Sequence, residues 1–342
     1  MSINLSILSS QQIKSLSYLT ECNVISAVSQ QENEEKWLAA RSKGIGGSDI
    51  GPICGVSPFT SARQIYLKKT NQYPPEFEPN EAAKQRMHFG HVLESIVADE
   101  YVARTGKKII ELPVTLSSKK YPWMLANIDR LIIDDEGHPY GVLECKTSSE
   151  YMNDEWSAGE LMTTYLYQLN WYLSVLGLNY GAFACLVGGN KFYTYELFKN
   201  DDLINKTLIP TGDTFWNYNV ANMIEPEMQA ADTEFANAIY NKANKNSEIA
   251  FEDETTDKIL EVIYTTKATI KTLNKTLEEA QNRIKDRLKD HDIGYSANYT
   301  VKWPQKTQNR IDSTVLKTKF PDIYKQVLKT TTFRTMTVKG ND

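Results

Sequence analysis

The spacing of apolar residues changes twice along the first two-thirds of the chain. From about residue 80 to 105 apolar residues recur three and four positions apart, which predicts a helix, and Gly106 follows it as a stop. From residue 108 an alternating pattern predicts three strands, in KIIELPVTL, WMLANIDRLII and YGVLECK, with DDEGHP as a hairpin turn between the last two. A second helix is expected from about 159 to 176, followed by a hairpin of FACLVGG and KFYTYEL. This order predicts an α/β fold of the α+β type, with a mixed central β-sheet flanked by helices.

Shorter helices are expected before this region. Ser29 can cap a helix through QQENEEKWLAARSKG, in which acidic residues occupy the first turns. Ser48 in GIGGSDI can cap a short helix that ends near Gly55, and SPFTSARQIYLKKTN supplies another cap and helix. Residues 1–28 fit either a tail or a first helix.

The C-terminal third has a different character. From residue 257 to 290 apolar residues again fall three or four apart with charges between them, which predicts a long amphipathic helix or a coiled coil. Packing on the rest of the chain is the preferred interpretation of its apolar face, and self-association is the alternative. The remaining residues read as strand, short helix and strand. The expected division is an N-terminal tail or helix (1–28), a core (29–225), a connection (226–254), and a long helix with a small basic α/β tail (255–342).

Composition excludes several classes of protein. With 41% hydrophobic and 24% charged residues the chain is not disordered, and no run approaches the roughly 20 apolar residues of a membrane-spanning helix. The N-terminus lacks a secretory signal pattern, so a cytoplasmic location is expected. The cysteines have no zinc-ligand or disulfide-framework spacing and are expected to be reduced and mostly buried. They are Cys22, Cys54, Cys145 and Cys185.

The net charge of -5 is unevenly distributed. Residues 255–342 carry 17 Lys plus Arg against 10 Asp plus Glu, so the acidic excess lies in the preceding residues. The basic end is therefore a candidate for contact with a polyanion, although such an excess is also common on a solvated surface.

A trio of charged residues stands around the predicted hairpin. Glu144 and Lys146 lie two apart on a strand and therefore share a face, while Cys145 points to the other side. Antiparallel pairing across the turn can bring Asp129 beside Glu144. Two carboxylates can hold Mg²⁺, which lowers the pKa of a bound water, and Lys146 can position or deprotonate that water during phosphodiester hydrolysis. Considered alone, a Glu-x-Lys pair is more often a surface salt bridge.

Two polar residues on predicted helices strengthen this interpretation. Glu94 and Gln168 both lie among apolar neighbours, and a buried polar group costs free energy unless it has a partner. Both are therefore expected to face a polar cavity, and a shared metal site would satisfy them. An interhelix hydrogen bond is the alternative for Gln168. His88 and His91 are expected to be structural, because no third nitrogen or sulfur ligand is near them in sequence.

Five segments in this order resemble the PD-(D/E)xK nuclease superfamily and, more closely, the YqaJ-type phage recombinase nucleases, which are relatives of lambda exonuclease. They are GIGGSDIGPICGVSPF, MHFGHVLES, LANIDRLI, GVLECKTSS and YQLNWYLSVLG, within residues 37–198. The RIDSTVLKTKFPDIY segment is similar to a tail of such phage proteins. Ile128 stands where the superfamily name has Pro, a position that varies. The resemblance implies a restriction-endonuclease-like core.

The resemblance also implies a catalytic set. It comprises Glu94, Asp129, Glu144, Lys146 and Gln168. Asp129 and Glu144 would be metal ligands together with the backbone carbonyl of Cys145, and Glu94 would support the metal directly or through water. Lys146 would activate the attacking water, and Gln168 would orient the site.

Arg41 and Ser48 have the spacing of an Arg and a Ser that hold the 5′-terminal phosphate in lambda-type exonucleases. A guanidinium can bind phosphate through two bonds, and a serine at a helix N-terminus adds a hydroxyl beside backbone N–H groups. A helix cap is the alternative role for Ser48.

Arg63 and Arg86 are weaker candidates for DNA contacts. More of the aromatic residues that could stack on bases are expected in the core than on DNA; these are Trp156, Tyr165, Tyr167, Trp171 and Tyr172.

The implied function is that of a Mg²⁺-dependent deoxyribonuclease, with Mn²⁺ as a substitute metal. It would degrade linear double-stranded DNA from 5′ to 3′ and leave 3′ single strands for an annealing protein in phage recombination, in the cytoplasm of a bacterial host. The family includes trimeric rings that enclose DNA, so a homo-oligomer is also implied. Two alternatives remain: an endonuclease or end-processing nuclease on the same fold, and a non-catalytic DNA-binding or assembly protein.

Overall fold

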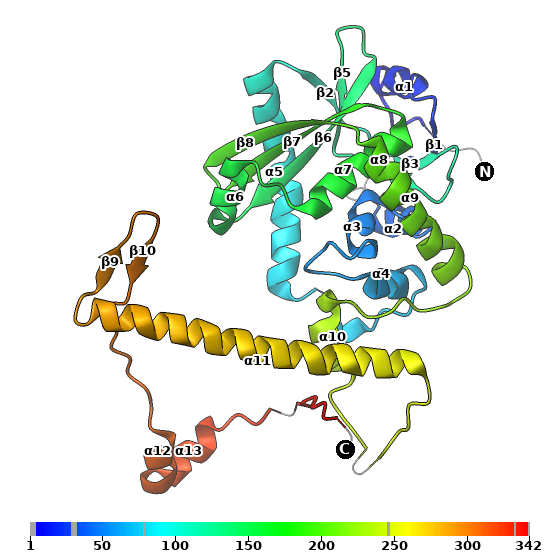
Figure 1. Cartoon of the computed structure of the whole chain (residues 1–342). Helices are drawn as coiled ribbons and strands as arrows, with labels where there is room; N and C mark the ends of the chain where they lie inside the picture. Colours follow the sequence, from blue (N-terminus) through cyan, green and yellow to red (C-terminus); the bar gives the residue numbers. More distant parts are fainter. Residues whose placement is uncertain (1–4, 29–32, 78, 245–246, 332, 341–342) are drawn as a thin grey trace. The chain divides into compact units, whose positions relative to one another are not determined.

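The computed structural model describes residues 5–28, 33–77, 79–244, 247–331 and 333–340. The chain forms two compact units, residues 1–235 and 236–342, and each is described by itself (Figure 1). None of the helices in the described ranges is both long and apolar enough to span a membrane.

A five-stranded sheet is the centre of the first unit. Its order is β2-β5-β6-β7-β8; β6 and β7 run parallel and the other neighbours are antiparallel, so the predicted mixed sheet is confirmed. The strands are β2 (Lys108–Ile110), β5 (Arg130–Ile133), β6 (Pro139–Ser148), β7 (Tyr180–Val187) and β8 (Lys191–Phe198). Both predicted hairpins, β5–β6 and β7–β8, are present.

Two of the predicted strands are each split between this sheet and a second one. The second sheet has the order β1-β3-β4, formed by β1 (Cys22–Ser26), β3 (Thr115–Ser118) and β4 (Leu125–Ala126). Pro113 separates β2 from β3, and proline cannot donate a backbone hydrogen bond to a ladder. Asn127 separates β4 from β5, and its Nδ2 donates to the carbonyl of Val114 and to Oγ1 of Thr115.

Helices cover the two faces of the central sheet. On one face α5 (Glu81–Thr105) packs its residues Val97, Ala98 and Tyr101 against the strands, and on the other lie α6 (Asn153–Ala158) and α7 (Thr163–Leu176) (Figure 1). The predicted stop of α5 is confirmed, because Gly106 ends the helix with φ of 69°. Asn80 caps its start. However, Phe89, Val92 and Ile96 are exposed, so the apolar spacing extends beyond the part of α5 that the sheet covers.

Four α-helices precede α5 in the described part of the first unit. They are α1 (Ser10–Ser17), α2 (Glu34–Arg41), α3 (Gly47–Ile53) and α4 (Ala62–Lys69). The predicted cap Ser29 lies outside the described residues, and Asn33 caps α2. The predicted cap role of Ser48 is wrong: Gly46 is the N-cap of α3, and its N–H donates to Oδ2 of Asp49 at 2.9 Å.

Beyond β8 a helical run leads to the end of the first unit. It comprises α8 (Asp201–Leu203), the π-helical turns η3 (Ile204–Leu208) and η4 (Thr214–Val220) with α9 (Ile209–Asp213) between them, and, farther on, α10 (Thr233–Ile239). Asp232 attaches this end to α4 because its carboxylate accepts hydrogen bonds from Ser61 and Gln64.

The second unit is dominated by α11 (Glu254–Leu288), as the sequence predicted. It is followed by a hairpin, β9 (Ile293–Tyr295) with β10 (Thr300–Lys302), and by α12 (Ser313–Lys319) and α13 (Pro321–Val327). The predicted last strand is wrong for the residues described after α13. A strand needs a neighbour for its backbone groups, and within the described part of this unit β9 and β10 pair only with each other.

Candidate active site

The β5–β6 hairpin brings two carboxylates together. Its register pairs Arg130 with Leu143, so one step farther along the ladder Asp129 comes opposite Glu144. Oδ2 of Asp129 accepts a hydrogen bond from the backbone N–H of Cys145 at 2.8 Å, which fixes the aspartate against β6. The juxtaposition expected from the sequence is therefore present.

Alternation along β6 separates the reactive face from the core face. Cys145 is buried with Val97 and Ala98 of α5, whereas Glu144 and Lys146 point toward α7. Nζ of Lys146 lies 2.9 Å from Oε2 of Glu144, and Glu144 is only 1% exposed. The pair is thus a buried ion pair and not the surface salt bridge of the alternative interpretation.

Gln168 on α7 joins this ion pair. Its Nε2 donates to Oε2 of Glu144 at 2.8 Å, and its Oε1 accepts from Nζ of Lys146 at 3.1 Å. The ring of Tyr165, also on α7, lies 5.1 Å from the same ammonium. Gln168 therefore connects a helix to the sheet, which excludes an interhelix hydrogen bond as its main contact.

Glu94 on α5 is connected to Asp129 by Arg130, a residue that the sequence did not indicate. Nη1 of Arg130 donates to Oε1 of Glu94 and to the backbone oxygen of Asp129, both at 2.6 Å. The Arg130 side chain is 9% exposed, although it lies on a strand whose following residues are all apolar. A charge in such a strand is the signal that could have identified it. His88 and His91 are both exposed on α5.

Burial and the charge of Asp129 raise the pKa values of the neighbouring carboxylates. Burial, then the charge of Asp129, raises the pKa of Glu144 to about 8. Burial and the same charge raise the pKa of Glu94 to about 7. The pKa of Asp129 is also raised, mainly by burial, against the opposing effect of Lys146. The cluster is therefore short of positive charge.

One carboxylate oxygen of this cluster could serve as a metal ligand. Oε1 of Glu144 is buried and has no hydrogen-bond partner among the described residues. Carboxylate oxygens are the ligands that Mg²⁺ prefers, and a divalent cation would offset the repulsion between Asp129, Glu144 and Glu94. The residues present therefore fit a divalent cation.

A second acidic group lies in the turn between β5 and β6. Asp134, Glu136 and His138 place one ligand atom each within 4.8 Å of one another. They are partly or fully exposed, and Nδ1 of His138 is 3.0 Å from Oδ2 of Asp134 across the turn. This group lies at the end of the hairpin away from Asp129 and Glu144, and the hydrogen bond that closes the turn explains it.

Arg41 and Ser48 are in direct contact. Nη2 of Arg41 donates to Oγ of Ser48 at 2.7 Å, and the guanidinium lies 4.6 Å from the ring centroid of Trp37. Asp49 is 8% exposed and forms a 2.8 Å ion pair with Lys69, whose Nζ also donates to the backbone oxygen of Arg41. Although burial opposes ionisation, the charges of Lys69 and Arg41 hold the pKa of Asp49 below its usual value.

Tyr172 links two clusters of candidate residues, the carboxylate cluster around Glu144 and the cluster of Arg41, Ser48, Asp49 and Lys69. Its hydroxyl accepts a 3.3 Å hydrogen bond from Nε2 of Gln168. Its ring contacts α3 so closely that a Cβ at Gly47 would come within 2.4 Å of Cε1. Glycine at this position therefore allows α3 to lie directly on α7. The pKa of Tyr172 is raised by burial and by Glu144 and lowered by Arg41, which places it in the field of both clusters.

The weaker candidates lie outside these clusters. Arg63 is paired with Glu225, and Arg86 is exposed on α5. The aromatic residues are mainly core residues, as expected: Trp156, Trp171 and Tyr172 are buried, and Tyr165 and Tyr167 are half-buried. The four cysteines are free thiols, and three of them are buried.

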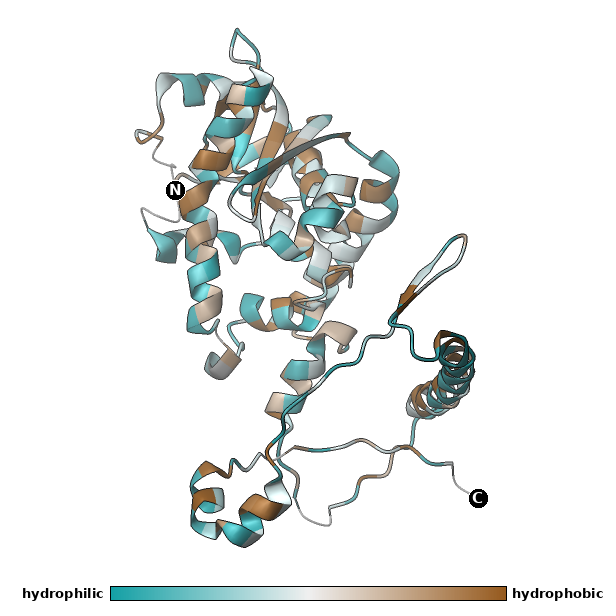
Figure 2. Cartoon of the chain, turned by 90° about the vertical axis from the view of Figure 1, so that its left-hand side faces the viewer, coloured by the Kyte–Doolittle hydropathy of each residue, from teal (hydrophilic) through white to brown (hydrophobic). Residues whose placement is uncertain are grey.

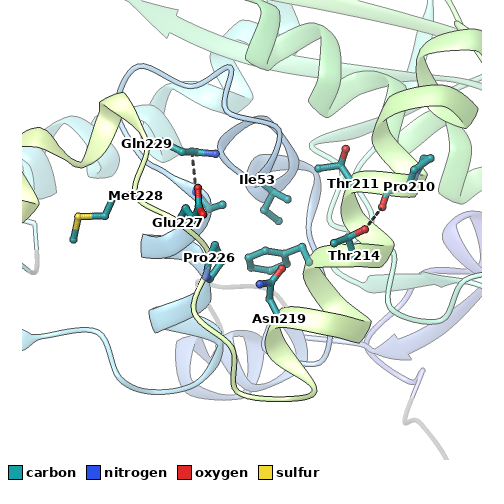
Figure 3. A pocket seen from close by; sticks show the side chains of 11 residues that line it. Ile53, Pro210, Thr211, Thr214, Asn219, Pro226, Glu227, Met228 and Gln229 are labelled. Carbon is teal, nitrogen blue, oxygen red and sulfur yellow. Dashed lines mark hydrogen bonds between the residues drawn. The ribbon is translucent and has the colours of Figure 1, made fainter. Parts of the chain in front are cut away.

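A pocket of about 550 Å³ lies between α3 and η4 (Figure 3). Its lining includes Ile53, Thr211, Phe215, Pro226 and Gln229. None of the carboxylates at the ends of β5 and β6 lines it, so it is separate from the candidate active site.

Comparison with known proteins identifies relatives of this chain. The YqaJ-like viral recombinase domain matches residues 36–179, a segment that includes both clusters. The uncharacterized protein YqaJ of Bacillus subtilis (strain 168) is 35% identical over 317 residues, which cover 92% of this chain and 96% of that protein.

Two solved structures are more distantly similar. An alkaline exonuclease from Laribacter hongkongensis is 17% identical with a TM-score of 0.45, covering 56% of this chain and 94% of that one. A phage related exonuclease from Haemophilus somnus 129PT is 11% identical with a TM-score of 0.39, covering 53% of this chain and 96% of that one.

Proposed function

The chain belongs to the family of YqaJ-like viral recombinase domains, and we propose that it is a metal-dependent nuclease that hydrolyses DNA. The main support is the contact set of Asp129, Glu144, Lys146 and Gln168, in which one buried carboxylate oxygen of Glu144 has no partner among the described residues. Such a set combines oxygen ligands for a cation with a fixed hydrogen-bond donor.

Asp129 and Glu144 would hold Mg²⁺, or Mn²⁺ in its place, with the backbone carbonyl of Cys145 as a third ligand and Glu94 as a supporting carboxylate. When bound, the cation supplies Lewis-acid stabilisation of the charge that develops on the phosphate oxygens. The N–H of Cys145 orients the carboxylate of Asp129, and Gln168 orients that of Glu144.

Lys146 acts as a charged hydrogen-bond donor. Burial favours its neutral form, but the carboxylates of Glu144 and Asp129 raise its pKa above the usual value. A lysine that remains protonated can orient the attacking water and contribute positive charge near the scissile phosphate, whereas it does not remove the proton of that water.

The finer proposal is a 5′-to-3′ exonuclease acting on linear double-stranded DNA. Its support is the Arg41–Ser48 pair. Gly47, next to Ser48, packs on the Tyr172 ring, and the hydroxyl of the same tyrosine accepts a hydrogen bond from Gln168. A 5′-terminal phosphate bound by Arg41 and Ser48 would bring a neighbouring phosphodiester toward Asp129 and Glu144. The product would be a 3′ single strand for an annealing protein, made by a homo-oligomer in the host cytoplasm.

Digestion of defined DNA substrates tests this function. Linear duplexes with a 5′-phosphate or a 5′-hydroxyl and a covalently closed circle are incubated with Mg²⁺ or with EDTA. We expect Mg²⁺-dependent loss of the 5′-phosphorylated strand first, slower loss of the 5′-hydroxyl strand and an intact circle. Lys146→Ala should abolish cleavage, and Lys191→Ala, at a partly exposed lysine paired with Glu150, should not.

Each other result selects an alternative. Cleavage of the circle would identify an endonuclease. DNA binding without cleavage under any metal condition, together with wild-type behaviour of Lys146→Ala, would identify a binding or assembly protein.

A further inference from the structure

The helix α11 carries a heptad pattern in which seven of ten seam positions are apolar. Between residues 256 and 287 one seam follows steps of three and four residues in strict alternation. The first seam position of each heptad is Thr256, Ile263, Ile270, Leu277 or Ile284, and the second is Ile259, Thr266, Leu273, Ala280 or Arg287. A seam with this mean spacing of about 3.5 residues is typical of a left-handed coiled coil, whereas a helix that packs on a globular core presents a wider stripe.

Within the second unit, the large side chains of the seam are not covered by other described residues. Ile270, Leu273 and Leu277 are 50%, 62% and 55% exposed, and the seam carries no charge before Arg287 at its end. Figure 2 shows α11 almost end-on, with hydrophobic residues in brown beside hydrophilic residues in teal. Leu288, outside the seam, is buried against the β9–β10 hairpin, where its Cδ2 would be 2.8 Å from a Cβ at Gly294. The hairpin thus contacts a residue next to the seam and does not cover the seam itself.

We propose that α11 pairs with α11 of a second copy of the chain as an antiparallel two-stranded coiled coil, centred between Ile270 and Leu273. A second copy fits because an exposed seam of this length can be covered along its whole extent by an identical helix. The helix of 35 residues is about 52 Å long, which exceeds the diameter of roughly 35 to 45 Å expected for a domain the size of the first unit.

The sizes of the seam residues favour the antiparallel direction. About the proposed centre, Ile263 faces the partner's Ala280 and Thr266 faces the partner's Leu277, so each small residue is matched by a large one. In a parallel pair every residue faces its own copy, which would stack alanine on alanine and threonine on threonine. Layers of two small residues leave space in the core, and unfilled space is destabilising.

The charges of α11 favour the same direction. Residues 254–261 contain three acidic residues and one lysine, whereas residues 282–289 contain four basic residues and one aspartate. Antiparallel pairing places the acidic start of each helix beside the basic end of the other, and it also opposes the two helix dipoles. Parallel pairing would place like charges together at both ends.

The mass of the full-length chain in solution tests the pairing. Ile270→Asp combined with Leu273→Asp places charges at the centre of the seam and should halve the mass measured by sedimentation equilibrium at about 50 μM. Thr272→Asp combined with Asn282→Asp adds the same charge outside the seam and should leave the mass unchanged. If the first units also associate, pairing through α11 joins two of those assemblies, so its loss should still halve the mass. A wild-type mass of 38.9 kDa, or a mass that the seam substitutions do not change, would overturn the proposal.

Disulfide trapping tests the direction. Chains with Ile259→Cys are co-expressed with longer, tagged chains with Ile284→Cys, and the unsubstituted pair is the background control for the four natural cysteines. An antiparallel pair should give disulfides between unlike chains. Disulfides between like chains would establish a parallel pair and overturn the proposed direction.

Discussion

Gln168 on α7 donates a hydrogen bond through Nε2 to Oε2 of Glu144 on β6 across 2.8 Å. The other end of the same amide accepts from Lys146, so a neutral side chain holds a buried carboxylate and a partly buried ammonium in fixed positions. We expect Gln168→Leu to lower the single-turnover cleavage rate by about 10- to 100-fold, because hydrogen bonds to charged groups contribute roughly 1.5 to 3 kcal/mol each. DNA affinity should change little.

Tyr167→Phe, one residue earlier on α7, is the control and should cleave at the wild-type rate. A wild-type rate for Gln168→Leu would show that Glu144 and Lys146 need no support from α7. A loss as complete as that of Lys146→Ala would instead place Gln168 in the chemistry itself.

Lys69 is expected to decide how well the chain recognises a 5′-phosphate. Its Nζ bonds Asp49 at 2.8 Å and the backbone oxygen of Arg41 at 2.9 Å, so it holds the end of α2 against the start of α3. Without it, Arg41 would be drawn toward Asp49 and away from phosphate. Lys69→Met should lower the ratio of cleavage rates on 5′-phosphoryl and 5′-hydroxyl duplexes by about 10-fold, the equivalent of roughly 1.4 kcal/mol.

The neighbouring Lys68→Met removes the same charge from an exposed lysine that lies over the ring of Tyr73, and it should keep the wild-type ratio. An unchanged ratio for Lys69→Met would remove Lys69 from the phosphate site. A fall of both rates by the same factor would indicate a general loss of folded protein.

The carboxylates of the candidate site could be placed from the sequence because they depend on local geometry. Antiparallel pairing of two strands across a hairpin turn places Asp129 opposite Glu144, and alternation along the second strand turns Cys145 toward the core. The site residues Arg130, Lys69 and Tyr172 could not be placed in the same way. Arg130 finds Glu94 36 positions away, and Lys69 and Tyr172 acquire their contacts only when α4 and α7 pack on α3.

The errors about secondary structure have a related cause. Ser48 does not cap α3, because its hydroxyl accepts from Arg41 and the chain enters the helix at Gly46, whose N–H donates to Asp49. Apolar spacing on α5 gave its length correctly, but spacing alone does not say that the sheet covers Val97 and leaves Phe89 exposed. Periodicity reports which residues share a face, and only the tertiary fold determines which faces are covered.

Asp232 is expected to stabilise the end of the first unit. It is 1% exposed and accepts hydrogen bonds from Ser61 Oγ at 2.6 Å, Gln64 Nε2 at 3.0 Å and the backbone N–H of Gln229 at 2.8 Å. Asp232→Ala leaves these three donors without their acceptor, so it should lower the free energy of unfolding by about 2 to 4 kcal/mol in urea titrations. Asp202→Ala, at an exposed aspartate paired with Lys206, should cost less than about 0.5 kcal/mol. A similarly small cost for Asp232→Ala would contradict a stabilising role.

Stabilisation by Mg²⁺ should increase with pH. The pKa of Glu144 is raised by burial and by Asp129 from its usual 4.5 to about 8, so between these values the folded chain retains a proton that the unfolded chain releases. Without metal this group therefore makes folding less favourable as pH rises through that window. A divalent cation competes with the proton, so its binding strengthens as the pH rises.

At about ten times its Kd, Mg²⁺ adds roughly 1.4 kcal/mol, or about 3 to 6 °C in Tm. We expect this rise at pH 8.5 and less than about 1 °C at pH 5.5 for the same Mg²⁺ concentration, by differential scanning calorimetry against EDTA. Glu144→Gln should lose the response at both pH values, and Glu150→Gln, at an exposed carboxylate, should keep it. A Tm rise that is equal at the two pH values would mean that Mg²⁺ binds somewhere other than Glu144.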